Sequence, residues 1–327
     1  MAAAMITSCS NEDELSQSNY PSDNIIRVTA GVNNAKTRAE GAGTEMKNDF
    51  SLTIVNKNAP KYTYTDKVFS KSSGDWACSE TLLWQKSDAL VDIVAFAPAQ
   101  TGKFNGVYAN GSIQPIAYSV AKDQTTADDN NDLLYYYAPG FNPGKSLVDK
   151  KLSIQFNHAF CMIDIVVTLG TEFNKPKVLD DSPIVKVTLD GTKIAANVDV
   201  KNAATGSTTT TAASVVTASE TATPTTITTT KGTFTKAANE EANAKSCFSC
   251  IAIPQTVAAN TFKVSLMTAG KRYEWTSDKE ITLKSGYRYT LELSMGNDVV
   301  LLKGGSDNGG ITATPWGNGT DGSLETD

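Results

Sequence analysis

A single histidine, His158, limits the catalytic chemistry open to this chain, because Ser–His–Asp and Cys–His mechanisms need an imidazole base. It lies in the run Ile154-Gln-Phe-Asn-His158, where alternation places Ile154, Phe156 and His158 on one face of a strand. That setting favours a structural histidine over a general base. No nucleophile–base pair is visible, and a pair of carboxylates cannot be placed together from one sequence. We therefore predict no catalytic residue and no enzymatic activity.

Cys247 and Cys250 have the C-x-x-C spacing of zinc and redox sites. No second pair of ligands accompanies them, and they begin an apolar strand, in which residues three apart point to opposite faces. We expect them, with Cys78 and Cys161, to be small buried hydrophobic residues. A single disulfide is the alternative in an exported protein, and the sequence does not indicate its pairing.

Two loops have the composition of ligand sites. Asp128-Asp-Asn-Asn-Asp132 offers oxygen ligands for Ca²⁺, but it lacks the glycine and the terminal glutamate of a calcium loop, so it is interpreted as a solvated turn. Residues 304–310 are glycine-rich, but no Lys-Ser/Thr follows them as in a phosphate loop, so they are interpreted as a flexible turn. We expect no metal site and no cofactor.

Composition excludes further classes of protein. The chain has 327 residues, with 29 Lys+Arg against 35 Asp+Glu and a net charge of −6. An acidic chain without a basic block binds nucleic acid poorly, so no nucleic-acid partner is expected. No run of about 18 apolar residues is present, so no membrane-spanning helix is expected. At roughly 100–200 residues per domain, the length predicts two domains.

Period-2 alternation and β-branched runs dominate the chain, which predicts an all-β fold. Helical periodicity is confined to residues 45–50 and 239–245. A segment with 15 Thr in 31 residues, at 205–235, is expected to form a long exposed hairpin or loop. The predicted strands, bounded by Gly, Asn, Asp and Pro, are 25–30, 51–55, 62–69, 90–97, 152–156, 161–169, 184–189, 248–253, 261–267, 273–276, 288–293, 299–302 and 311–315.

The start of the chain resembles a targeting signal. Ile6-Thr7-Ser8-Cys9 resembles a bacterial lipoprotein box, and the acidic run at 10–14 resembles the surface-export tag of lipoproteins from the Bacteroides group. Cys9 is thus the predicted lipidation site, which would hold the chain at the outer membrane. A secretory signal needs a basic start and an apolar run of 7–15 residues, so we expect the natural start to lie further upstream. The alternative is a cytosolic protein with Cys9 by chance.

Several segments, taken in order along the chain, form one pattern. Val91-Asp-Ile-Val-Ala-Phe-Ala-Pro98 is a strand ending in an aromatic residue and a proline. Asp132-Leu-Leu-Tyr is followed by Leu152-Ser-Ile-Gln-Phe-Asn-His-Ala and Ile163-Asp-Ile-Val-Val. Near the end stand Lys284-Ser-Gly-Tyr-Arg-Tyr-Thr-Leu-Glu-Leu and Ile311-Thr-Ala-Thr-Pro-Trp316. Each motif alone is weak, but their order resembles the fimbrillins of Bacteroidales.

The resemblance implies two transthyretin-like β-sandwich domains in tandem, in a subunit of a type V pilus that is exported through the periplasm as a lipoprotein. Such subunits are cut by an Arg-specific protease and polymerise with other fimbrial subunits by strand exchange. The cut is expected after Arg38, in a polar, small-residue stretch, with Ala39 as the new N-terminus. Arg27 is the weaker candidate because it lies within a predicted strand.

The same interpretation divides the chain into four parts. They are a signal remnant at 1–9, a tether and removable strand at 10–38, an N-terminal sandwich at 39–172 and a C-terminal sandwich at 173–327. Loss of the strand would leave unpaired backbone groups that template another strand. The tail of a neighbour would fill this groove, and head-to-tail contacts of this kind build an open filament. The predicted donor-strand residues are Val299, Val300, Leu301, Leu302, Ile311, Ala313 and Trp316.

Two alternatives stay open. The tail at 299–316 could instead complete the sheet of its own domain. The whole protein could instead be a surface glycan-binding lipoprotein, in which aromatic side chains stack on sugar rings of a host or bacterial ligand. The aromatic candidates for that role are Trp76, Trp84, Trp275 and Trp316.

Overall fold

The computed structural model describes residues 19–33, 46, 48–126, 131–203, 214–302 and 311–316. Within them the chain is built almost wholly of strands, which confirms the all-β prediction. The α-helix found there, α1 (Pro143–Ser146), is a single turn. Short 3₁₀ turns lie at Pro60–Tyr62, Asn105–Val107, Thr171–Asn174 and Val200–Ala203.

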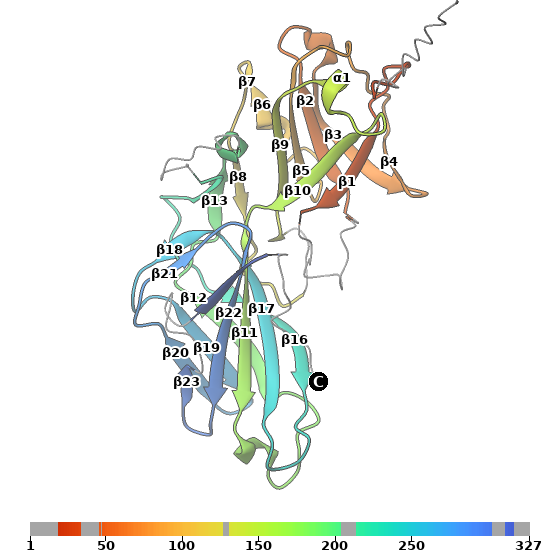
Figure 1. The fold of residues 1–327 in the computed structure, drawn as a ribbon. Coiled ribbons are helices and arrows are strands. Elements are labelled where there is room, and N and C mark those ends of the chain that lie inside the picture. Colours follow the sequence, from red (N-terminus) through yellow and green to blue (C-terminus); the bar gives the residue numbers. More distant parts are fainter. Residues whose placement is uncertain are drawn as a thin grey trace, which may run out of the picture.

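A closed barrel forms the first group of strands, at the top of Figure 1. Alternation explains its core: β10 buries every second residue, and Leu152, Ile154 and Phe156 point into the barrel. The strands, in order around the barrel, are β1 (Val28–Val32), β10 (Leu152–His158), β9 (Leu134–Phe141), β5 (Val91–Ala97), β2 (Phe50–Val55), β3 (Tyr64–Ser72) and β4 (Asp75–Cys78).

A larger sheet forms the centre of the second group. In order it contains β16 (Thr230–Thr235), β17 (Ala244–Ala252), β11 (Cys161–Leu169), β22 (Tyr287–Met295) and β23 (Val300–Leu302), and β24 (Ile311–Pro315) also pairs with β22. Nearly every residue of β11 is buried because the strand is central. A second sheet shares the same apolar core and contains β15 (Ile227–Thr228), β12 (Ile184–Asp190), β19 (Lys263–Thr268) and β20 (Arg272–Thr276).

Three small sheets complete the described part of the chain. Figure 1 shows β8 and β13 between the barrel and the larger sheets. Because β8 comes before β10 in sequence and β13 comes after β11, the chain crosses this junction more than once. The small sheets are β14 (Val216–Ala218) with β13 (Ala195–Val198) and β8 (Ile116–Ser119), β18 (Gln255–Val257) with β21 (Ile281–Leu283), and β6 (Tyr108–Ala109) with β7 (Ser112–Ile113).

Two apolar clusters lie in these strands. One fills the barrel, and the other runs from the outer face of β5, at Val94 and Phe96, through the larger sheets. The expected division between residues 172 and 173 would separate β11 from both of its partners, β17 and β22. We propose that any division falls instead between His158 and Cys161, where the chain leaves the barrel.

The predicted strands are all present, with ends that differ by a few residues. The eight-residue β9 was not predicted, because Pro139 and Gly140 interrupt its pattern. They lie where the pairing with β5 shifts register, and Gly140 has a φ of 60° and donates its N–H to Asp92 Oδ1 at 2.9 Å. The two expected helical pieces are wrong: residues 239–242 form a turn flanked by bends, and the described residues of 45–49 form no helix before β2 begins.

The Thr-rich segment does not form the expected hairpin within its described part, 214–235. Its strands β14, β15 and β16 pair in three different sheets. The few apolar side chains decide this arrangement, because Val216 and Ile227 are buried in the larger core and fix the strands that carry them.

Candidate functional site

The strand β1 closes the barrel by pairing in parallel with β10. The register runs from Val28 opposite Leu152 to Val32 opposite Phe156. Ile26, Val28 and Val32 are buried, and each such side chain contributes about 1.5–3 kcal/mol on leaving water. Residues 26–32, which precede Ala39 in the sequence, are therefore part of the barrel wall and its core.

On its other side β1 is held much less firmly. It pairs with β4 only through Val28 and Trp76. Just before the strand, Ile26 donates its N–H to the Leu82 carbonyl at 2.9 Å. Between these two points lies a cavity of about 220 Å³, lined in part by Phe69 and Cys78. The barrel is thus continuous along β10 and nearly open along β4.

The two predicted cleavage candidates differ in what the structure says of them. Arg38 and Ala39 lie outside the described residues, as does the predicted lipidation site, Cys9. Arg27 is described: its carbonyl accepts the Leu152 N–H at 2.8 Å, and its guanidinium pairs with Asp23 at 2.6 Å. The hydrogen bond from Arg27 lowers the pKa of Asp23 to about 2. The backbone at Arg27 is thus engaged in the ladder.

The predicted donor tail pairs within its own chain in this structure. β23 and then β24 lie along the same edge of β22. Ile311 is buried, whereas Ala313, on the same face of the strand, is exposed. In β23, Val300 is 9% exposed, while its neighbours carry the exposed apolar surface: Val299 at 49%, Leu301 at 58% and Leu302 at 38%.

The end of the tail contacts the only histidine. The Trp316 indole stacks on the His158 ring, and its backbone N–H donates to the Gly286 carbonyl at 2.6 Å. His158 Nδ1 lies 3.0 Å from Asp132 Oδ1, and all three side chains are buried. His158 therefore has the structural role predicted for it. Asp132 was expected in a solvated turn, and it is buried because it contacts His158.

The described cysteines carry no disulfide. Cys161 and Cys250 are fully buried and Cys247 is half-buried, on the opposite face of β17 from Cys250. Burial raises the pKa of the Cys161 thiol and that of Cys247, which disfavours the reactive thiolate. Cys161 and Cys250 are thus buried as predicted, whereas Cys78 and Cys247 are only half-buried and depart from that prediction.

Other kinds of site were sought in the described residues. No group of three or more His, Cys, Asp and Glu side chains there could hold a metal ion, and no helix there is long and apolar enough to cross a membrane. None of the four tryptophans is an exposed platform: Trp84 and Trp316 are buried, and Trp76 and Trp275 are half-buried in the cores.

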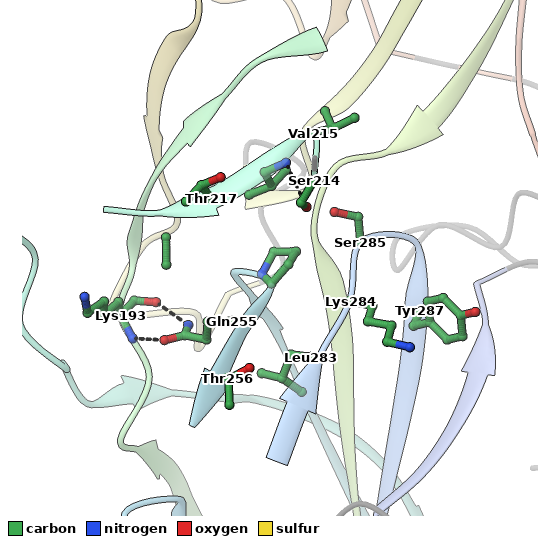
Figure 2. A pocket seen from close by; sticks show the side chains of 13 residues that line it. Lys193, Ser214, Val215, Thr217, Gln255, Thr256, Leu283, Lys284, Ser285 and Tyr287 are labelled. Carbon is green, nitrogen blue, oxygen red and sulfur yellow. Dashed lines mark hydrogen bonds between the residues drawn. The ribbon is translucent and has the colours of Figure 1, made fainter. Parts of the chain in front are cut away.

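A cavity of about 780 Å³ lies beside β14, and sequence reasoning missed it. Figure 2 shows β14 on one side and the turn from Leu283 to Tyr287 on the other. Gln255, on β18, is joined to Lys193 in a further part of the wall, since its side-chain amide exchanges hydrogen bonds of 2.9 and 3.0 Å with the backbone of Lys193. The residues come from four separate segments, so no local motif could have revealed the cavity.

A barrel closed by its first strand and a tail paired along a sheet edge characterise the described part of this all-β chain. The chain belongs to the fimbrillin-like family, whose model matches residues 37–316. This membership places it among the proteins of fimbriae rather than among enzymes, and it confirms the resemblance seen in the sequence.

Solved structures agree on the fold. A candidate cell adhesion protein from Bacteroides ovatus superposes with a TM-score of 0.56 at 17% identity, covering 89% of this chain and 96% of its own. One from Bacteroides uniformis gives 0.55 at 13%, covering 90% and 99%. A fimbrial protein from Bacteroides vulgatus gives 0.53 at 14%, covering 89% and 99%. No curated protein matches the chain.

Proposed function

We propose that this protein is a fimbrial subunit that reaches the cell surface as a lipoprotein through Cys9. An Arg-specific protease cuts it between Arg38 and Ala39, and it then polymerises with other subunits by strand exchange. The lipid anchors it to the outer membrane until the cut. The position of β1 carries the proposal, since β1 lies in the part that the cut would detach and closes the barrel between β10 and β4.

The sequence of β24 supports it as the incoming strand. β1 has the sequence Val-Thr-Ala-Gly-Val, and β24 has Ile-Thr-Ala-Thr-Pro. Aligned residue by residue, Ile311 takes the place of Val28 and Pro315 the place of Val32. The two exposed threonines, Thr29 and Thr312, then coincide. β23 contains no such match, so we assign the donor role to β24 and to the residues that follow it.

A proline at the last position of the incoming strand is compatible with the hydrogen bonds that β1 makes to β10. The Arg27 carbonyl accepts from Leu152 and the Asn33 N–H donates to Phe156, so the odd-numbered residues of β1 bond to β10. The N–H of Val32 points away from β10, and β4 does not pair with that residue. Pro315, which has no N–H, therefore loses no bond to β10 when it occupies this place.

A disulfide between copies tests this register. Thr29 pairs with Ser153, so Thr312→Cys in one copy should meet Ser153→Cys in the next, at the inter-strand spacing of about 4.8 Å. After cutting with an Arg-specific protease and mild oxidation, we expect covalent ladders on denaturing gels. Cys78 and Cys247 are replaced by Ser in every variant to prevent other links.

The matched control shifts one partner by two residues. Thr312→Cys with Gln155→Cys places the thiols on the same face but out of register, and it should give few links. Uncut protein should give none between copies. Equal ladders from both pairs would refute the register, and cut protein that stays monomeric with a stable barrel would refute strand exchange itself.

A further inference from the structure

The cavity beside β14 carries a charge opposite to that of the protein. The chain has a net charge of −6, yet the charged residues that line the cavity are Lys193 and Lys284, without a carboxylate. Lys193 Nζ donates to the Ser219 carbonyl at 3.0 Å and thereby holds the strand end. Lys284 is exposed and makes no ion pair with any described residue. It is the cation available to a ligand.

Four hydroxyl groups lie among apolar side chains in the rest of the cavity wall. Ser214, Thr217, Thr256 and Ser285 all contribute to its wall. The Ser285 Oγ is buried and has no hydrogen-bond partner within the described chain. Figure 2 shows it directed across the cavity towards Ser214. Because a buried polar atom without a partner is unfavourable, a ligand group that bonds this hydroxyl would be stabilised there.

An aromatic ring stands beside the cation. Tyr287 is half-buried and packs against the larger core, and it borders the cavity close to Lys284 in Figure 2. A sugar ring presents an apolar C–H face to aromatic rings and hydroxyl groups at its rim. A volume of about 780 Å³ lies within the range of small-molecule sites and has room for a short saccharide.

We propose that this cavity binds an acidic saccharide, with the carboxylate at Lys284, a sugar hydroxyl on Ser285 and the ring against Tyr287. The charge of the lining selects an anion, and the hydroxyl groups select a polyhydroxylated one. Tyr287 pairs with Pro315 of β24 in the uncut chain, so the site borders the strand that the proposed exchange would withdraw, and binding is tested on the uncut protein. The cavity would give the subunit a saccharide-binding site, a role that the four tryptophans do not fill.

Isothermal titration of the full chain tests the proposal with defined probes. Glucuronic acid and N-acetylneuraminic acid are compared with their methyl esters, which keep every hydroxyl but lose the charge. We expect saturable binding of the acids and about tenfold weaker binding of the esters, as for the loss of one charge-assisted hydrogen bond. Equal binding of acid and ester would overturn the assignment of Lys284.

Variants locate the site. Lys284→Gln should weaken binding of the acids about tenfold and leave the weak binding of the esters unchanged. Ser285→Ala should weaken both severalfold. Lys145→Gln, on α1 at the far end of the barrel, is the matched control, and it should change nothing. Thermal unfolding of each variant shows that the fold is intact.

Three results would refute the proposal. One is that none of the acids binds. Another is that Lys145→Gln weakens binding as much as Lys284→Gln, which would mean attraction by general charge. The third is that inorganic sulfate displaces the sugars at concentrations equal to their own, which would mean a simple anion site. Displacement by the free acid sugars alone supports a saccharide site.

Discussion

The imidazole of His158 and the indole of Trp316 are stacked face to face, with their centroids 3.9 Å apart and their planes 6° from parallel. His158 ends β10, the strand that pairs with β1, and Trp316 ends the tail. The tail of the uncut protein is therefore fixed to the same strand that would receive the tail of a neighbour. Release of the tail requires the loss of this contact.

Removal of the indole should loosen the tail. Trp316 is 3% exposed, so Trp316→Ala should lower the free energy of unfolding by about 3–5 kcal/mol, as for other buried aromatic residues. Hydrogen exchange of the β24 amides should accelerate more than that of β11. Thr312→Ala, at an exposed position of the same strand, should have little effect. Unchanged exchange in β24 would mean that the stack does not hold the tail.

The side chain of Val28 should contribute to the stability of the uncut protein but not to the stability of the assembled polymer. Val28→Ala should destabilise the uncut protein by about 2 kcal/mol because a buried methyl pair is lost, whereas Thr29→Ala on the outer face should not. If β24 replaces β1, Ile311→Ala should instead destabilise the polymer. Denaturant melts of the monomer and the polymer separate the two effects. A polymer sensitive to Val28→Ala would show that β1 is retained.

Acid should weaken the anchoring of the segment before β1. Arg27 lowers the pKa of Asp23 from 3.8 to about 2, so the paired carboxylate stabilises the fold above pH 3.8, and this contribution disappears as the pH falls towards 2. NMR titration of Asp23 should show the low pKa, and Arg27→Gln should raise it towards 3.8. Exchange of the Ile25 amide, which donates to Asp23, should then be faster at neutral pH as well. A pKa of Asp23 near 3.8 in the natural sequence would contradict the ion pair between Arg27 and Asp23.

Local pattern in the sequence predicted most strands but not their partners. The bounds of β11 agree with its apolar run from Cys161 to Leu169, yet the run alone does not say which sheet a buried strand enters. Its partners, Ala244–Ala252 and Tyr287–Met295, are distant in sequence. The parallel pairing of β1 with β10 could not be predicted for the same reason, since no turn joins the two strands.

The surroundings of His158 illustrate the same limit for sites. Alternation in β10 predicted that the imidazole is buried, and it is. The contacts that give it a role come from Asp132 and Trp316, in segments that only the fold brings together. The cavity at Lys284 was missed because its lining joins Lys193, β14, β18 and the turn before β22, and no single motif spans these segments.

Two arginine variants should separate the cleavage candidates. Proteases bind substrates as extended, accessible chain, and the Arg27 carbonyl is engaged by the Leu152 N–H inside the barrel wall. Arg27→Gln should therefore be cut and assemble like the natural sequence, apart from the loss of its pair with Asp23. Arg38→Gln should stay uncut and monomeric, as judged by N-terminal sequencing and denaturing gels. Assembly of Arg38→Gln with an intact N-terminus would separate polymerisation from the cut, and cutting after Arg27 in the folded protein would mean that β1 opens before the protease arrives.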